Sequence, residues 1–399
     1  MNPDLDRLQS YPFQKLATLL QGVAPAAGLA PVKLHIGEPK HPTPEFIRRA
    51  LADNLAGLSS YPTTLGGESL RVAIADWLKR RYALTSIDAG SQIIPVNGSR
   101  EALFSFAQSV IDRTRPRPGV IVPNPFYQIY EGAALFAGAT PHYLHTLAAD
   151  NFALNVRQLP ESTWRDAQLV YLCSPANPTG RVMSLDEWRE LFALSDRHGF
   201  VIAADECYSE IYFEEDRAPL GALQAARELG RDGYPRLVVF SSLSKRSNVP
   251  GMRSGFVAGD AAILKKYLLY RTYQGCAMSP PIHAASTAAW QDEAHVVENR
   301  RLYREKFAAV TAVLRDVTEV RMPDAAFYLW LDTHGDDTAF TRRLHEQQNV
   351  SVLPGSYLAR DARGINPGKG FVRIALVAST AECTEAAHRI AKVFRDSSV

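Results

Sequence analysis

The chain has 399 residues, of which 46% are hydrophobic, and its 44 lysines and arginines nearly balance its 42 aspartates and glutamates. This length exceeds what one compact core usually serves, so we expect two domains. The formal net charge is +2, and no long basic or acidic run occurs. The composition therefore gives no indication of a nucleic acid or of an anionic membrane surface as a partner.

The cysteines and the first residues are typical of a reduced protein that is not secreted. The four cysteines lie far apart without a C-x-x-C pair, which argues against a disulfide framework and against a thiolate metal site. The start, "MNPDLDRLQSYPFQKL", lacks a cationic segment followed by an apolar run of about 7 to 15 residues, and no later segment reaches about 18 uninterrupted apolar residues. We therefore expect a cytoplasmic protein without a metal and without a membrane span.

The first part of the chain predicts an arm followed by two helices. Residues 1–43 are interrupted by proline and glycine, as in "GVAPAAGLAPVKLHIGEPKHPTP", which favours an arm packed across the rest of the molecule. Apolar residues at helical spacing then predict a helix over "PEFIRRALADNLA" and a second over "ESLRVAIADWLKRRY".

From about residue 92 onward, short apolar runs alternate with amphipathic stretches. The runs are "QIIPV", "GVIVP", "AQLVYLCS", "FVIAAD" and "RLVVFSS", and helices are expected from Ser99, Phe126 and Ser184. Strands that are apolar on both faces and alternate with helices indicate a mainly parallel sheet covered on both sides. The fold class is therefore α/β, with a large domain over residues 44–283.

The last part of the chain changes this rhythm. A long helical pattern runs over roughly 283–316, and the segments "VRMPDAAFYLWLD", "VSVLPGS" and "GFVRIALV" follow with helices between and after them. This pattern predicts an interdomain helix and a smaller α+β domain over residues 284–399, to which the arm contributes.

Polar side chains gather where the predicted strands end. "VNGSREA", "PNPFY", "SPANPTG", "DECY" and "SSLSKR" each follow one of the five apolar runs. In an open parallel sheet, ligands bind in the crevice outside the carboxyl ends of the strands. We therefore expect these five ends to converge on one site.

Lys245 stands just beyond the apolar run "VVFSSLS". Partial burial and a neighbouring cation, either Arg246 or Arg253, would lower its pKa and favour a nucleophilic amine that forms Schiff bases with carbonyl groups. A solvated loop lysine is the alternative reading of this residue alone.

Several residues near this lysine and at a predicted helix start could together hold an anion, and we call this set the anion cradle. Hydroxyls, an arginine fork and the start of a helix are the groups that hold a phosphate dianion. The candidates are Ser242, Ser244, Arg253, Gly98, Ser99 and Arg100. Each occurs commonly in caps and turns, and only the combination is informative.

Four further side chains suit a flat ring with charged edges. Asp205 ends an apolar run and needs a cation, such as a protonated ring nitrogen, unless it caps the following turn. Tyr208 and Asn177 can donate to a ring oxygen, and Tyr127 can stack on the ring, although each has an ordinary packing or turn role as its alternative. A phosphate, a carbonyl, a ring oxygen and a basic ring nitrogen together describe pyridoxal 5'-phosphate.

The set "NPTG", "DECY", "SLSK" with an arginine eight residues after the lysine, and a late "VRIAL", resembles the fold-type I, class I aminotransferase family over essentially the whole chain. The resemblance implies that Lys245 binds the cofactor covalently and carries the proton between the two reacting carbons. It also implies the other roles: Asp205 pairs with the ring nitrogen, Asn177 and Tyr208 hold the ring oxygen, Tyr127 stacks on the ring, and Gly98, Ser99, Arg100, Ser242, Ser244 and Arg253 hold the phosphate.

The family pattern adds three more positions. Tyr61, in "SSYPTTLGGESLR", matches a tyrosine that reaches the phosphate of the neighbouring subunit, which implies an obligate homodimer with shared active sites. Arg373, in "GFVRIALV", matches the arginine that binds the α-carboxylate of the amino-acid substrate. From its strand position alone, Arg373 either pairs with an anion or faces solvent. Gly37, in "HIGEP", matches a backbone contact beside that carboxylate, as does Asn177.

The substrate follows less directly from the sequence. The region "YQGCAMSPP" lacks the arginine with which aspartate aminotransferases hold a second carboxylate, so a simple dicarboxylate specialist is not expected. The strings "SLSKRSNVPGMRSGF" and "GINPGKGFVRIALV" are similar to those of succinyldiaminopimelate transaminases. This similarity implies transamination between glutamate and N-succinyl-LL-2,6-diaminopimelate in lysine and diaminopimelate biosynthesis, with Arg100, Lys15 and Asn248 as candidates to bind the succinyl end.

Three alternatives stay open on the sequence. The chain could be a β-eliminating C–S lyase on the same cofactor, or an aminotransferase for acetylornithine, aromatic or LL-diaminopimelate substrates. It could also be the ligand-sensing domain of a transcription regulator. Such regulators carry an additional DNA-binding module and a linker, whereas here the domain begins within about forty residues of the start of the sequence.

Overall fold

The computed structural model describes residues 1–397 and contains a central sheet of seven strands in the order β2-β8-β7-β6-β5-β3-β4. All neighbouring strands are parallel except β8, which is antiparallel to both β2 and β7. In sheet order, the strands are β2 Ile93–Val96, β8 Gly255–Gly259, β7 Leu237–Ser242, β6 Val201–Asp205, β5 Ala167–Cys173, β3 Gly119–Asn124 and β4 Thr140–His145. The predicted mainly parallel α/β fold is confirmed.

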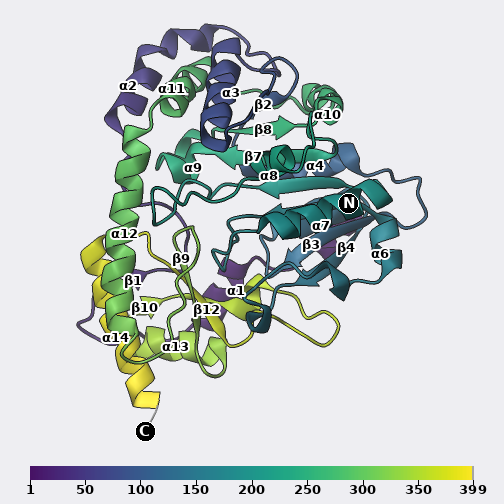
Figure 1. Cartoon of the computed structure of the whole chain (residues 1–399). Helices are drawn as coiled ribbons and strands as arrows, with labels where there is room; N and C mark the ends of the chain where they lie inside the picture. The colour runs from purple at the N-terminus through teal and green to yellow at the C-terminus, as the bar shows by residue number, and fades with distance from the viewer. Residues whose placement is uncertain (398–399) are drawn as a thin grey trace.

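The buried strands send alternate side chains to opposite faces, because successive residues of a strand point in opposite directions. In β5, Leu169 and Tyr171 join one hydrophobic cluster, whereas Val170 and Leu172 join another. Helices cover both faces (Figure 1), and one cluster contains side chains of α3, α7, α8 and α11, while the other contains those of α4, α5 and α10. The bounds of these helices are α3 Glu68–Tyr82, α4 Ser99–Val110, α5 Ile129–Phe136, α7 Leu185–His198, α8 Ala222–Glu228, α10 Ala261–Gln274 and α11 Pro280–Gln291.

Two details of this region differ from the sequence expectation. Strands β4 and β8 were not predicted, since β4 is an edge strand with mostly half-exposed residues and β8 is a short "GFVAG" segment behind a loop. The helix expected from Phe126 begins only at Ile129, after a turn.

The prediction of one long helix over 283–316 is wrong, because the structure has two helices in this region, α11 and α12 (Ala294–Leu314). Asp292 leaves the helical conformation at φ −101° and ψ 132°, and its carboxylate accepts a hydrogen bond from the backbone N–H of His295 at 3.0 Å. A side-chain oxygen that caps free N–H groups starts a new helix. The long helix α12 then runs from the seven-stranded sheet to the C-terminal part of the chain (Figure 1).

The C-terminal part contains an antiparallel sheet of order β11-β12-β9 and a parallel pair, β1-β10. Since β1 lies in the arm, the first residues of the chain pair with the last part of it, which supports the proposed assignment of the arm to the small domain. The domain boundaries at 43 and 283 stay predictions. The elements are β1 Val32–Lys33, β9 Tyr328–Asp332, β10 Val350–Ser351, β11 Leu353–Pro354, β12 Phe371–Ala375, α13 Asp337–Gln348 and α14 Thr380–Ser397.

The remaining elements are short and connect or cover these layers. They are the helices α1 Pro12–Leu19, α2 Glu45–Asp53, α6 Glu161–Asp166 and α9 Leu243–Arg246, and the 3-10 turns Pro3–Arg7, Leu55–Ser59, Ala148–Asp150, Val156–Gln158, Pro250–Met252 and Gly355–Leu358.

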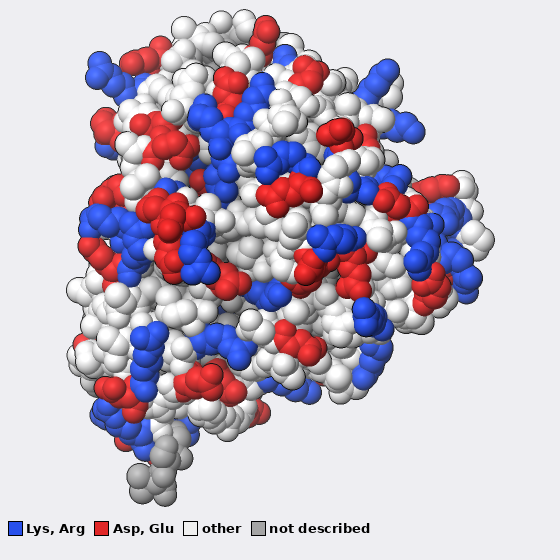
Figure 2. Space-filling view, viewed as in Figure 1, with Lys and Arg blue, Asp and Glu red and all other residues white. Residues whose placement is uncertain are grey.

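The surface shows charges of both signs interspersed over the viewed face, without a large area of one sign (Figure 2). Within residues 1–397, no helix has the length and apolar character to cross a membrane, and no group of His, Cys, Asp and Glu could hold a metal ion. All four cysteines are free thiols. The cytoplasmic location stays a prediction.

Candidate active site

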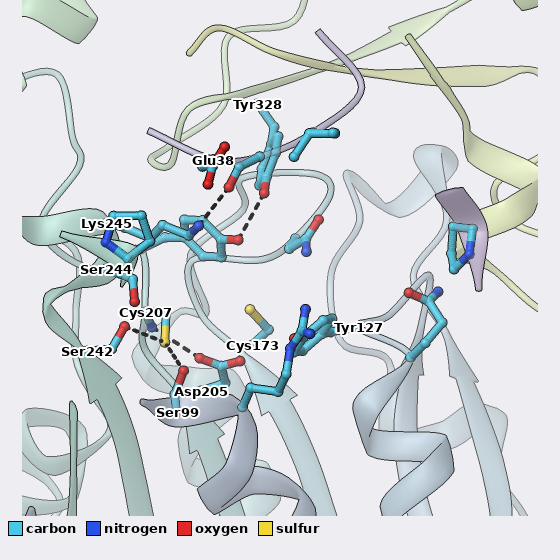
Figure 3. Close-up of a pocket in the computed structure, with 18 of the residues that line it drawn as sticks. Glu38, Ser99, Tyr127, Cys173, Asp205, Cys207, Ser242, Ser244, Lys245 and Tyr328 are labelled. Atoms are coloured by element: carbon cyan, nitrogen blue, oxygen red, sulfur yellow. Dashed lines mark hydrogen bonds between the residues drawn. The ribbon is translucent and has the colours of Figure 1, made fainter. Parts of the chain in front are cut away.

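A cavity of about 430 Å³ lies at the carboxyl ends of the parallel strands, where the arm and the C-terminal part meet the large sheet. It brings together side chains that follow five different strands: Ser99 after β2, Tyr127 after β3, Asn177 after β5, Asp205 at the end of β6, and Lys245 after β7. Figure 3 shows Ser99, Tyr127, Asp205 and Lys245 facing one space. Since parallel strands end at the same edge, segments far apart in the sequence meet there.

Lys245 is held in the cavity by a hydrogen bond that its Nζ donates to the backbone carbonyl of Gly37 at 2.6 Å. The pKa of this amine is lowered to about 8, chiefly by burial and also by the cation of Arg373, while Cys207 opposes the shift. Roughly a tenth of the amine is therefore unprotonated at pH 7, far more than of an ordinary lysine, and a nucleophile or a proton carrier requires this neutral form.

The expectation that Arg246 acts on Lys245 is wrong. The guanidinium of Arg246 lies 4.8 Å from the ring centroid of Trp290, is 1% exposed, and pairs with Glu293 at 2.5 Å. It therefore stabilises the packing of α9 against α11 and does not face the cavity.

Asp205 is a buried carboxylate, 4% exposed, that receives hydrogen bonds from Tyr130 Oη at 2.8 Å and from the backbone N–H of Cys207 at 3.2 Å. Burial raises its pKa, and these donors oppose the shift. No cation of the described chain forms an ion pair with it. A buried, unpaired carboxylate beside a cavity is suited to a ligand that brings a positive charge.

The proposed anion cradle is assembled at the start of α4. Ser99, Ser242, Ser244 and Arg253 line the cavity, and Gly98 precedes α4 with φ +84°. A Cβ at Gly98 would collide with the guanidinium of Arg253, so the close approach of this arginine requires glycine. Arg253 donates only to backbone carbonyls, those of Pro250 and Asn97. Among the residues described, it therefore has no anionic partner.

Arg373 is 4% exposed, so the reading that it faces solvent is excluded. It donates to Asn177 Oδ1 and to the backbone carbonyl of His35, both at 2.9 Å, and its guanidinium lies 4.5 Å from the ring centroid of Tyr328. Its Nε has no partner, and no carboxylate in residues 1–397 pairs with it. A buried arginine surrounded by neutral acceptors is suited to bind a ligand carboxylate.

Three tyrosines and Arg100 complete the walls. Tyr208 is hydrogen-bonded to Tyr328 through the two hydroxyls at 2.9 Å. Tyr127 accepts from Arg100 Nε at 2.6 Å, which places the exposed Arg100 at the wall next to the Tyr127 ring. Gly37 lies directly against the Tyr328 hydroxyl, where a Cβ would not fit.

Three residues named from the sequence do not line this cavity. Tyr61 is fully exposed on the chain surface, and its contact with a partner subunit stays a prediction. Lys15 lies near the ring of Tyr357 at 5.9 Å, and Asn248 is buried against Asn299. Neither Lys15 nor Asn248 lines the cavity, and their binding of a succinyl group stays a prediction.

Several cavity residues were not found from the sequence. Those from the arm, including α1, and from β9 are marked by no local motif: Tyr11, Phe13, Ile36, Glu38 and Tyr328. Cys207 also lines the cavity and could have been noticed within "DECY"; its thiol donates to Ser99 Oγ at 3.0 Å beside the anion cradle.

The cavity therefore fits pyridoxal phosphate on observations of this structure alone. It contains a buried carboxylate without a cation, an amine of lowered pKa, and hydroxyls with an arginine that has no anionic partner. No single motif demonstrates this fit, which depends on all three groups facing one space.

The sequence profile of the family described as "Aminotransferase class I and II" matches residues 30–390. This chain belongs to that family. It is accordingly a pyridoxal-phosphate-dependent aminotransferase.

Three relatives describe how close the similarity is. An aminotransferase from Neisseria meningitidis, known from a crystal structure, is 53% identical in sequence to this chain. Its structure superposes with a TM-score of 0.96, and the match covers 99% of this chain and 100% of the other. A probable N-succinyldiaminopimelate aminotransferase from Thermus thermophilus is 27% identical, with a TM-score of 0.84 over 96% of this chain and 100% of its own. An LL-diaminopimelate aminotransferase from Maridesulfovibrio salexigens is 29% identical over 97% of this chain and 98% of its own.

The lowered pKa of Lys245 gives a first prediction. In the apoprotein, the rate at which this amine is acetylated should rise with pH and level off above about 8, because the amine is neutral above its pKa. Exposed lysines of the same sample are the internal control, since an ordinary lysine has a pKa of about 10.4. Mass spectrometry of the labelled peptides measures both. Lys245→Ala should also remove the visible absorption of the lysine-bound cofactor, and an unchanged spectrum would refute the assignment.

Arg373 gives a second prediction. Arg373→Gln should raise the KM of both glutamate and 2-oxoglutarate about 30-fold or more, because loss of a buried charged partner costs about 2 kcal/mol or more. The cofactor absorption should stay unchanged. Arg395→Gln, an exposed change on α14, is the matched control. An unaltered KM in Arg373→Gln would show that the carboxylate binds elsewhere.

Proposed function

We propose that this aminotransferase transfers an amino group between glutamate and N-succinyl-2-amino-6-oxopimelate, forming 2-oxoglutarate and N-succinyl-LL-2,6-diaminopimelate. One observation carries the proposal: besides Arg253 of the anion cradle, the cavity has two arginines without a carboxylate partner among the residues described, Arg373 inside and Arg100 at the wall. Two separated cations are suited to an elongated substrate with carboxylates at both ends.

The residues of the chain divide the reaction among them. When bound, pyridoxal phosphate supplies an aldehyde that reacts with amines and a ring that withdraws electrons from the substrate Cα. Arg373 orients the α-carboxylate, so that the Cα proton lies within reach of Lys245. Lys245, as a free amine, takes that proton from Cα and, with the cofactor bound, would deliver it to the carbon that carried the cofactor's aldehyde. Asp205 stabilises positive charge at the ring nitrogen from its buried position.

The names of two relatives support a diaminopimelate-type substrate but differ on the succinyl group. The Thermus thermophilus structure is named as a probable N-succinyldiaminopimelate aminotransferase, and the Maridesulfovibrio salexigens relative as an LL-diaminopimelate aminotransferase. LL-diaminopimelate is therefore the second candidate. It carries an ammonium group and a carboxylate at its distal end, whereas the succinylated substrate carries a neutral amide and two carboxylates there.

The charges at the cavity favour the succinylated substrate. The lining carboxylates within residues 1–397 are Asp205, which is at the ring-binding end, and Glu38, which already pairs with Lys40 at 2.7 Å. A distal ammonium group would compete with Lys40 for Glu38. The additional carboxylate of the succinyl group would instead meet Arg100, whose side-chain partner in the structure is the neutral Tyr127 hydroxyl.

A homodimer belongs to the same proposal. Tyr61 is fully exposed, and the neighbouring turn Leu55–Ser59 exposes Leu55 and Leu58 by 52% and 66%. Helix α10 exposes Tyr273 by 88%. Apolar side chains exposed to this extent are typical of surfaces that a partner covers. In such a dimer, Tyr61 would reach the phosphate bound by the partner chain.

A substrate panel tests the proposed function. With glutamate as donor, the purified enzyme should form 2-oxoglutarate faster with N-succinyl-2-amino-6-oxopimelate than with acceptors that yield LL-diaminopimelate, acetylornithine or aromatic amino acids. Arg100→Gln should raise the KM of the succinylated acceptor about 10-fold, the effect of losing about 1.4 kcal/mol, and should leave that of an alanine-forming acceptor unchanged. Faster turnover of another acceptor would overturn the substrate, and release of pyruvate and ammonia from a sulfur amino acid would indicate β-elimination.

A further inference from the structure

A chain of polar groups connects α12 to the backbone of the catalytic lysine, outside the cavity. It consists of Lys306 and Asn299 on α12, each 2% exposed, and of the half-buried His41 in the arm. None of the three lines the cavity or carries a role in the reaction described above. Buried polar groups are costly unless they are satisfied, so this chain requires an explanation.

The contacts of the chain are short and continuous. Lys306 Nζ lies 2.6 Å from His41 Nε2, and His41 Nδ1 lies 2.7 Å from Asn299 Oδ1. Asn299 Nδ2 then donates to the backbone carbonyl of Lys245 at 3.2 Å. The same Nδ2 approaches the carbonyl of Arg246 at 3.5 Å. The amide of Asn299 therefore caps the carboxyl end of the short helix α9, which carries Lys245.

The direction of every hydrogen bond in this chain is determined. Two backbone carbonyls can only accept, so the NH₂ group of Asn299 faces them and its oxygen faces His41. Asn248 Nδ2 donates to the same oxygen at 3.0 Å. His41 must therefore donate through Nδ1–H, and its Nε2 accepts a hydrogen bond from Lys306. Lys306 donates to His41, His41 donates to Asn299, and Asn299 donates to Lys245.

The charges around the chain keep it in this arrangement. Burial lowers the pKa of Lys306 to about 8, and Glu382 and Cys383 of α14 oppose the shift. Burial and then the Lys306 cation lower the pKa of His41, against the hydrogen bond to Asn299 and the charge of Glu298. His41 thus stays neutral beside a protonated Lys306 at neutral pH, as the hydrogen-bond directions require.

The arm holds Lys245 at two points within five residues. The carbonyl of Gly37 accepts from Lys245 Nζ, and His41 supports the amide that holds the Lys245 carbonyl. The side chain and the backbone of the lysine are thereby both attached to the segment 37–41. Lys306 fixes the far end of that segment to α12.

We propose that Lys306, His41 and Asn299 form a positioning relay that fixes the backbone and the amine of Lys245 for proton transfer. The three side chains are positioning residues and not catalytic residues, because they act through Lys245 and the arm. A misplacement of about 1 Å at a reacting group costs up to about 100-fold in rate. The inference rests on the role of Lys245 and is independent of which acceptor the enzyme uses.

Two substitutions separate positioning from packing. Lys306→Met keeps the buried volume, removes the donor to His41 and removes a charge whose burial is itself costly. Asn299→Asp keeps the acceptor for His41 but replaces the donor to Lys245 by an oxygen. Both variants should lower kcat about 10-fold or more with glutamate while KM changes less than about two-fold. Lys306→Met should keep or raise the unfolding temperature.

A measurement on the apoprotein tests the relay without measuring catalytic activity. Amide hydrogen exchange over residues 36–42 should become faster in both variants, and exchange in the central strands should not change. Asn54→Asp is the matched control, since Asn54 also donates to a backbone carbonyl, that of Ala50 at 2.8 Å, but lies at the exposed end of α2. Unchanged kcat and unchanged exchange of 36–42 in both variants would overturn the relay. A failure of the succinylated substrate alone would leave these results unaffected.

Discussion

Besides the exposed Arg100 and Arg253, three charged side chains lie around one cavity without a partner of opposite charge among residues 1–397: Asp205, Lys245 and Arg373. Burial of an unpaired charge costs several kcal/mol, and the fold supplies only neutral hydrogen-bond partners to reduce that cost. The surrounding structure is arranged to hold these charges in place. Parallel strands bring Asp205 and Lys245 to one edge, and β12 brings Arg373 from the other side of the cavity. The cofactor and the amino-acid substrate supply the opposite charges.

The arm and α12 maintain this arrangement from outside the cavity. The arm pairs through β1 with β10 and then passes over Lys245, so that Gly37 and His41 hold the lysine from two directions. Helix α12 carries Asn299 and Lys306 on one face, at positions two helical turns apart. The reactive amine is therefore supported by elements from the beginning and from the last third of the chain.

The strand ends could be predicted from the sequence because each motif is local: "NPTG", "DECY" and "SLSK" stand directly after apolar runs. The side chains that support them could not. Tyr130 reaches Asp205 from the face of α5, and Tyr328 reaches Tyr208 from β9, more than one hundred residues away in the sequence. The break between α11 and α12 was also missed, because the capping by Asp292 depends on one aspartate inside an otherwise helical pattern. The role predicted for Arg246 was wrong for a related reason: only its packing against Trp290 shows that the side chain faces the core.

The most direct test of this account is the protonation state of the cofactor ring nitrogen, measured by ¹⁵N NMR of the enzyme loaded with ¹⁵N-labelled pyridoxal phosphate. Asp205 has no other cation to pair with in the described chain, so the ring nitrogen should be protonated from pH 6 to about pH 8 in the wild type. In Asp205→Asn it should be unprotonated over the same range. An unprotonated nitrogen in the wild-type enzyme at pH 7, or the same ¹⁵N shift in both proteins, would contradict the account.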